Sequence, residues 1–467
     1  MTDFIIKRLP YDLSSNAGLA LVGQYLQRLD LSGRLDRRFP VGVGGIANSD
    51  IVKSYLGLLV QGKNDFDAIE AFRGDAFFKR SLGISTVPSS PTLRQRMNTH
   101  AQSWFTLAGD LNEALLSPRA GKGVAKGAGM AVDFGSLPCG YMPVDWDTFV
   151  MNNDGSKKDD VGRTYQGVDG YTPSVTYLGS LGYCLELALR PGVQHSALET
   201  ELNLERVLPM ATRLTAMPLL FRADSGLCSL KVMQEIQAQA SALKREIAFI
   251  IKWNPRSTPA ETIAAQRVAD ADTMWCHWRE GKRECQWSEA ITLQGVGTEA
   301  QAVRRIYRLT ERTIDKQGQA QLLPAYKLEG WTTTLPERFT CADIIALYRD
   351  HGTHEQFHSE FKTDMDLERL PSGKFDTNYL VCALAAVAMN LLRLIGQNTL
   401  NGKDAPLRHK AKRRRIKTVL QEIMFKAARM IRHAGRWALG LGANDSAYIV
   451  FERLYRQMTP QAKPAPA

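Results

Sequence analysis

The chain has 467 residues, about three times the ~150 residues typical of one domain, so we expect at least two cores. With 44% hydrophobic and 23% charged residues, its composition excludes a disordered or fibrous protein. The seven cysteines are scattered without a C-x-x-C pair, which argues against a disulfide framework or a cysteine-rich zinc module and favours a reducing cytoplasm.

Residues 1–125 are expected to be helical. Apolar side chains recur there at spacings of three and four, in 19–29 and again in 51–59. Ser89 and Pro91 precede a turn with Arg94 and Arg96, the pattern of a helix start that either faces a phosphate backbone or lies on the surface. The first residues lack a basic segment leading into a long apolar run, so no export signal is expected.

Residues 126–254 predict an α/β core. Short strands are expected at 143–150, 174–178, 185–189, 218–224 and 247–252, with helices over 199–214 and 227–240. Residues 255–335 alternate and are rich in aromatic side chains, which predicts an inserted all-β subdomain. Helices return over 336–400, where the apolar run 379–395 is interpreted as a buried helix and not a membrane span.

All of the net charge lies in residues 401–467. They hold 15 Lys and Arg against 4 Asp and Glu, a charge of +11, while the preceding residues contain 44 of each. The densest run, 408–417, leads into a predicted helix with Lys426, Arg429, Arg432 and Arg436 after it. Such a segment either binds a polyanion or is a solvated, solubilising helix end.

Four acidic residues lie at predicted strand ends or helix starts. Asp145 and Asp147 are two apart on one strand and therefore point to one face, and Asp224 ends a later strand. Thr353 and Gln356 form a predicted capping box that puts Glu355 in the first turn of a helix. Two aspartates and a glutamate provide the oxygen ligands that two hard divalent cations require, although acids at strand ends are also common without a metal.

The sequence around Glu355 resembles the Tyr, Arg, Glu, Lys signature of bacterial insertion-sequence transposases of the DDE class. Tyr348, Glu355 and Lys362 are in register with that signature, and His351 stands where the signature has Arg. The chain is similar over nearly its whole length to the insertion-sequence family numbered 1380, through segments 145–161, 162–173, 189–195, 222–226 and 366–375.

This resemblance implies an RNase H-like core with the first Asp on its first strand, the second on its fourth, and a β-rich insertion before the glutamate helix. It implies a cut-and-paste DNA transposase that cleaves double-stranded DNA at terminal inverted repeats and joins it to a target, as a homodimer at two ends, in a bacterial cytoplasm at the nucleoid. Two Mg²⁺, replaceable by Mn²⁺, would be held by Asp147, Asp224 and Glu355, with Asp145 the alternative first Asp.

The domain and DNA-contact predictions follow from the same resemblance and from the charge. Residues 1–125 would bind and synapse DNA ends, 126–254 and 336–400 would form the core, 255–335 the β-rich insertion, and 401–467 a basic helical region. The expected DNA contacts are Tyr348, Arg349, His351, Lys362, Lys412, Arg413, Arg414 and Arg415.

Two alternatives remain at this stage. A catalytically silent DNA-binding descendant would keep the fold, with His351 as its first lesion. His354, Glu355 and His358 also spell H-E-x-x-H, the pattern of zinc peptidases, with Glu368 as a possible third ligand. A peptidase would leave Asp147, Asp224 and the basic region unexplained, so it is the less favoured interpretation.

Overall fold

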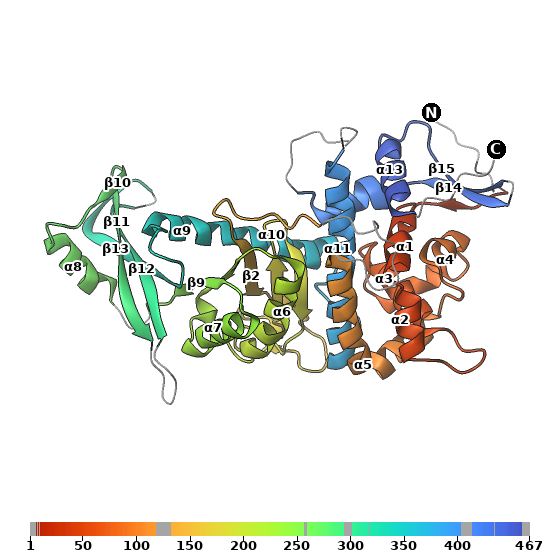
Figure 1. Ribbon diagram of the computed structural model, residues 1–467, viewed down its shortest axis with the longest axis horizontal. Coiled ribbons are helices and arrows are strands. Elements are labelled where there is room, and N and C mark those ends of the chain that lie inside the picture. Colours follow the sequence, from red (N-terminus) through yellow and green to blue (C-terminus); the bar gives the residue numbers. More distant parts are fainter. Residues whose placement is uncertain are drawn as a thin grey trace.

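The computed structural model describes residues 6, 8, 10–117, 132–255, 259–293, 301–315, 317–402, 413–433 and 435–459. The molecule is elongated (Figure 1). A β-rich part lies at one end, a sheet covered by helices lies in the middle, and a helical part that includes both N-terminal and C-terminal segments lies at the other end.

The N-terminal part is helical, as predicted. After the short strand β1 (Leu13–Ser14), its elements are α1 (Leu19–Arg28), α2 (Leu31–Arg38), α3 (Asn48–Leu59), the 3-10 helix η1 (Phe66–Phe72), α4 (Ala76–Leu82) and α5 (Ser90–Leu116). Helix α5 begins where the sequence predicts, because the Ser89 side chain accepts a hydrogen bond from the Thr92 amide and Pro91 lies in the first turn.

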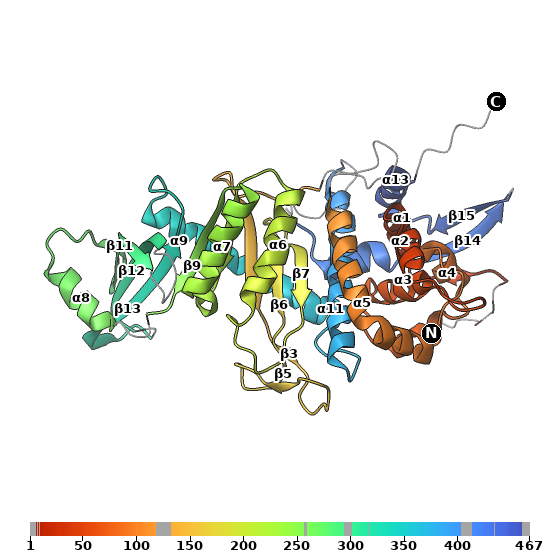
Figure 2. The same cartoon turned by 60° about the horizontal axis from the view of Figure 1, so that its bottom comes forward.

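Helix α11 (Phe375–Leu400) lies beside α5 and also packs against the edge of the sheet at β7 (Figure 2). It is long and apolar enough to cross a membrane, but 94% of its most apolar 18-residue window is buried inside the protein. The apolar run 379–395 is therefore a core helix, as predicted.

The central sheet is mixed and, in the described part of the chain, has the strand order β10-β11-β12-β13-β9-β8-β2-β6-β7. Strands β2 (Met142–Thr148), β6 (Ser174–Leu178) and β7 (Tyr183–Ala188) are antiparallel neighbours. Strands β8 (Leu219–Ala223) and β9 (Ile247–Trp253) run parallel to β2. Helices α6 (Thr200–Leu214) and α7 (Leu230–Leu243) lie side by side along the sheet (Figure 2), so the α/β prediction for this region is confirmed.

A small second sheet interrupts the chain between β2 and β6. It pairs β3 (Met151–Asn152) with β5 (Asp169–Tyr171) and β5 with β4 (Gly162–Arg163). The loop that follows β4 carries Tyr165, whose hydroxyl donates a hydrogen bond to the Thr148 carbonyl oxygen at 3.4 Å. This small sheet therefore places an aromatic ring beside the end of β2.

Residues after β9 extend the same sheet. Their elements are α8 (Ala260–Ala269), β10 (Cys276–Arg279), β11 (Lys282–Leu293), β12 (Gln301–Ile314) and β13 (Ala320–Thr333). Strand β13 pairs antiparallel with β9, so this β-rich part continues the central sheet. The expectation of an all-β segment is wrong at α8, because the Pro259 start and the helix-forming Ala, Glu, Gln and Arg side chains favour a helix there.

The chain then forms α9 (Cys341–Asp350), the 3-10 turn η3 (His351–Thr353), α10 (His354–Ser359) and the π-helical turn η4 (Glu360–Asp364). A capping box forms at Thr340 and Asp343. The box predicted at Thr353 and Gln356 is absent, because Thr353 already has helical torsions and its hydroxyl donates to the Asp350 carbonyl oxygen at 2.9 Å. Residues 341–364 thus form one continuous helical segment with a 3-10 turn inside it.

The basic C-terminal region is only partly helical. Its elements are α12 (Ile416–Val419), the π-helical turn η5 (Leu420–Met424), β14 (Ala428–His433), β15 (Arg436–Leu441) and α13 (Tyr448–Met458). The helical prediction is wrong at Arg429, Arg432 and Arg436, which lie on an antiparallel hairpin. The hairpin forms because Gly435 adopts the positive φ of its turn and β14 also pairs with β1.

Candidate active site

Two of the predicted acidic residues meet at one edge of the sheet. Strands β2 and β8 are parallel neighbours, and their register pairs Trp146 with Ala223. Asp147 and Asp224 each follow directly, so both carboxylates emerge at the carboxyl ends of adjacent strands. Both line one cavity of about 840 Å³. The cavity is therefore the candidate active site.

Asp145 is engaged inside the protein. Its carboxylate accepts hydrogen bonds from Arg222 at 2.6 and 2.8 Å and contacts His351 Nδ1 at 3.1 Å, and its side chain is only 5% exposed. Burial alone would raise the pKa of Asp145, but Arg222 and His351 together outweigh it and hold that pKa well below its usual range. Of the two alternatives for the first Asp, Asp147 is the one that faces the cavity.

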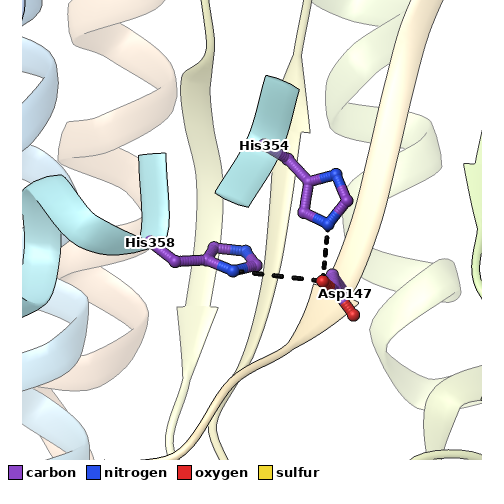
Figure 3. Close-up of side chains that lie close together, drawn as sticks. All are labelled: Asp147, His354 and His358. Carbon is purple, nitrogen blue, oxygen red and sulfur yellow. Dashed lines mark hydrogen bonds and ion pairs between the residues drawn. The ribbon is translucent and has the colours of Figure 1, made fainter. Parts of the chain in front are cut away.

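Asp147 also meets two imidazoles, as Figure 3 shows. His354 Nε2 lies 2.6 Å from Asp147 Oδ2, and His358 Nδ1 lies 3.9 Å from the same oxygen. The two histidines are one turn apart on α10, so both rings project from one side of the helix toward β2. Within the described residues, these three side chains form a group whose ligand atoms all lie within 4.8 Å of one another.

Burial and neighbouring charges shift the pKa values of the ionisable side chains in this group. Burial raises the pKa of Asp224, and the negative charge of Asp147 raises it further. Burial would also raise the pKa of Asp147, but the hydrogen bond from His354 and the neighbouring histidines lower it overall. Burial would lower the pKa of His354, but its hydrogen bond to Asp147 and the charge of that carboxylate raise it. Burial lowers the pKa of His358 to about 3. The two carboxylates, Asp147 and Asp224, therefore repel each other, and a bound cation would stabilise them.

The structure does not bring Glu355 to this group. The Glu355 side chain is exposed, and within the described part of the chain it has no hydrogen bond or ion pair. The 3-10 turn η3 explains the difference, because its tighter winding turns His354 toward β2 and Glu355 toward solvent.

The other residues of the signature have different surroundings. Tyr348 is half-buried, with its ring centroid 5.9 Å from that of Trp331, while Arg349 is exposed. His351 is only 3% exposed and its Nδ1 contacts the Asp145 carboxylate, so it faces the sheet and not the solvent. Lys362 forms an ion pair with Glu368 at 3.0 Å.

Most of the basic residues of the C-terminal region that were predicted to contact DNA form ion pairs within the protein. Arg413 pairs with the buried Glu360, Arg415 with Asp364 at 2.9 Å, and Arg414 with Glu422 at 2.9 Å. Lys412 lies outside the described residues.

Sequence analysis missed several residues of the cavity. Tyr165, His195 and Trp253 line it but lie in loops or at a strand end with no recognisable spacing. His354 and His358 were noticed, through H-E-x-x-H, but were assigned to a different function. The peptidase interpretation loses its third ligand, because Glu368 is bonded to the Asn152 amide and to Lys362.

A sheet edge with two carboxylates in a cavity is the kind of site that metal-dependent phosphoryl-transfer enzymes use. The profile of the family described as "Transposase DDE domain group 1" matches residues 11–463, nearly the whole chain. The chain therefore belongs to this family and is a DDE-type DNA transposase. DDE transposases use divalent metal ions.

Among solved structures, the cryo-EM structure of the piggyBac transposase synaptic complex with hairpin DNA is similar to this chain at 10% sequence identity. The likeness covers 97% of this chain and 87% of that chain, with a TM-score of 0.39. It is too loose to establish a shared fold. No curated protein sequence matches the chain.

Proposed function

We propose that this transposase cleaves double-stranded DNA at the inverted repeats of its element and transfers the ends to a target by a cut-and-paste route. Asp147 and Asp224 are the catalytic carboxylates in this proposal. The observation that carries it is their position at the ends of neighbouring parallel strands, facing one cavity of about 840 Å³. This is the finer assignment that the resemblance to the insertion-sequence family numbered 1380 implies.

The same proposal takes the core to be RNase H-like. Its support is the chain order of the sheet. Asp147 lies on β2, the first strand of the central sheet, and Asp224 follows β8, the fourth. The β-rich segment 255–335 separates Asp224 from the helices that carry Glu355, as in the expected domain division of 1–125, 126–254, 255–335, 336–400 and 401–467.

The donor set fits divalent cations, because two carboxylates on adjacent strands offer oxygens to one cavity. When bound, two such ions, Mg²⁺ or Mn²⁺, activate the attacking water or 3′-hydroxyl and stabilise the leaving oxygen. The chain's own contribution is positional: Asp145 and Arg222 fix β2 against β8, so that Asp147 and Asp224 keep their spacing. Glu355 is proposed as the third carboxylate only because its position matches the Glu of the Tyr, Arg, Glu, Lys signature.

DNA binding is assigned in this proposal to the β14–β15 hairpin. Arg429, Arg432 and Arg436 are exposed there, in contrast to the engaged Arg413 and Arg415. A two-stranded ribbon with arginines can follow a DNA groove or backbone. Because two element ends must be cut together, a homodimer on paired ends in the bacterial cytoplasm, at the nucleoid, completes the proposal.

The test is cleavage of a labelled duplex that carries the element's own ends, in Mg²⁺ or Mn²⁺ at low salt. Asp147→Asn and Asp224→Asn should abolish 3′-OH products while DNA binding is retained, and Glu355→Gln should do the same if the signature assigns it correctly. Retained cleavage in either Asp variant would overturn the assignment of that residue.

A further inference from the structure

The group formed by Asp147, His354 and His358 contains two histidines, which a site of three DDE carboxylates does not explain. Two imidazoles and one carboxylate surround a point at the end of β2. Imidazole nitrogen suits Zn²⁺ and related borderline cations, whereas Mg²⁺ requires oxygen ligands and keeps its waters. We propose that Asp147, His354 and His358 form a site for a borderline divalent cation that binds Zn²⁺ in preference to Mg²⁺.

The distances in the group fit a single small ion. Tetrahedral ligands at about 2.1 Å from one ion lie roughly 3.4 Å from each other. The distances from Asp147 Oδ2 to the two histidine nitrogens, 2.6 and 3.9 Å, lie on either side of that value. Changes of less than about 1 Å in these two distances would bring both to that value.

The orientation of the His354 ring is fixed by a backbone contact. Its Nδ1 contacts the His351 carbonyl oxygen, and because a carbonyl only accepts, Nδ1 carries a proton. Its Nε2 donates a hydrogen bond to Asp147 Oδ2 at 2.6 Å in the absence of a metal, so a bound cation would take the place of that proton. A histidine whose second nitrogen donates to a backbone carbonyl is the usual support of a metal ligand.

His358 is buried without a hydrogen-bond partner. It is 8% exposed, its Nε2 makes no hydrogen bond within the described residues, and its Nδ1 points at Asp147 from beyond hydrogen-bond distance. Phe149 and Tyr177 stack on its ring at 4.8 and 5.8 Å between centroids, which fixes the direction of that nitrogen. A cation beside Asp147 would give Nδ1 the partner that it lacks.

This inference rests on the proposed function only for the place of Asp147 in the active site. The test is titration of metal-free, full-length protein with ZnCl₂ by calorimetry, with and without excess Mg²⁺, and metal analysis of the dialysed protein. We expect one Zn²⁺ per chain that Mg²⁺ does not displace, so Zn²⁺ should compete with the Mg²⁺ that the proposed function places at Asp147. His354→Ala and His358→Ala should each weaken Zn²⁺ binding by more than about 100-fold, since even supporting partners of a metal ligand are worth about 10 to 100-fold.

A control variant keeps the test specific. His277→Ala, on the exposed strand β10, should leave Zn²⁺ affinity unchanged. Thermal melting establishes that each variant is folded, and the visible spectrum of Co²⁺-loaded protein should show histidine-dependent tetrahedral coordination. Zn²⁺ affinity that survives both histidine substitutions, is absent from the native protein, or is lost in His277→Ala would overturn the proposal.

The outcome is separable from that of the proposed function. Loss of Zn²⁺ binding in the histidine variants supports the site even if no DNA is cleaved. Mg²⁺-dependent cleavage by a protein that does not bind Zn²⁺ would support the transposition chemistry and overturn the mixed-ligand site.

Discussion

Asp145 on β2 and Arg222 on β8 face each other across adjacent parallel strands and form two hydrogen bonds of 2.6 and 2.8 Å. Arg222 also donates to the Leu347 carbonyl oxygen at 2.6 Å and pairs with Asp350 at 3.1 Å. The pair therefore links β2 and β8 to the end of α9, and Asp145 lies two residues before Asp147 on β2.

Asp145→Ala should strongly destabilise the protein, because it leaves the Arg222 guanidinium, 1% exposed, without its main counter-charge. Removing one partner of a buried ion pair costs about 3–5 kcal/mol. Urea unfolding followed by circular dichroism measures the loss. Arg37→Ala, which breaks the exposed Arg37–Asp30 pair, should cost no more than about 1 kcal/mol. Equal effects of the two substitutions would contradict a structural role for Asp145.

In the proposal, the exposed arginines of the β14–β15 hairpin bind DNA. Arg432→Ala with Arg436→Ala should weaken binding to all duplexes alike and reduce the slope of log affinity against log salt by about 1 to 2, since each lost phosphate contact removes about 0.9. Fluorescence anisotropy at several salt concentrations measures the slope. A slope like that of the native protein would place the DNA contacts elsewhere.

Arg413 and Arg415 should behave differently from the hairpin arginines. Arg413 pairs with Glu360, which is fully buried beside Arg393, and Arg415 pairs with Asp364. Arg413→Ala should therefore lower the melting temperature while leaving the salt slope of DNA binding unchanged. A reduced slope without loss of stability would restore the original prediction that this run contacts phosphate.

The β-rich extension should contribute to acid sensitivity through Glu329. Burial would raise the pKa of this carboxyl, but Arg308 and Lys327 lower it from 4.5 to about 2. Because the folded pKa lies below the unfolded value, the stabilisation is complete above about pH 4.5 and is lost as the pH falls toward 2.

Glu329→Gln should therefore flatten the acid limb of the stability profile. Between about pH 5 and pH 3 its melting temperature should fall by roughly 1–3 °C less than that of the native protein. The exposed Glu337→Gln is the matched control and should follow the native curve. Parallel curves for all three proteins would show that Glu329 is not coupled to Arg308 in solution.

Much of the sheet could be predicted from sequence, because buried strands such as Leu219–Ala223 and Ile247–Trp253 are short apolar runs followed by polar residues. The position of Asp147 beside Asp224 follows from the same pattern, since parallel neighbours end at the same edge. The hairpin at Arg429–Arg436 could not be predicted, because its strands are amphipathic and depend on pairing with the distant strand β1.

The sequence alone could also not predict which face of the helical segment carries Glu355. In an uninterrupted α-helix His351 and Glu355 share a face, and the signature relies on that spacing. The 3-10 turn at His351–Thr353 rotates the following residues, so His354 and not Glu355 meets β2.

Tyr165 is the aromatic residue that we expect to contact DNA at the cavity. Its ring is 66% exposed and lines the same cavity as Asp147 and Asp224, and burial together with these two charges raises the pKa of its hydroxyl. Stacking of a nucleobase on an aromatic ring is worth about 1–3 kcal/mol. Tyr165→Ala should therefore reduce the cleavage efficiency of end-containing DNA by about 5 to 150-fold.

Tyr165→Phe separates the ring from the hydroxyl. The hydroxyl makes a long, 3.4 Å hydrogen bond to the Thr148 carbonyl oxygen and a further contact with the Gln166 side chain, neither of which involves the catalytic carboxylates, so the Phe variant should cleave at nearly the native rate. Because the side chain is mostly exposed, neither substitution should shift the melting temperature by more than a degree or two. If Tyr165→Phe loses as much cleavage as Tyr165→Ala, the hydroxyl and not the ring acts at the site, and the stacking interpretation fails.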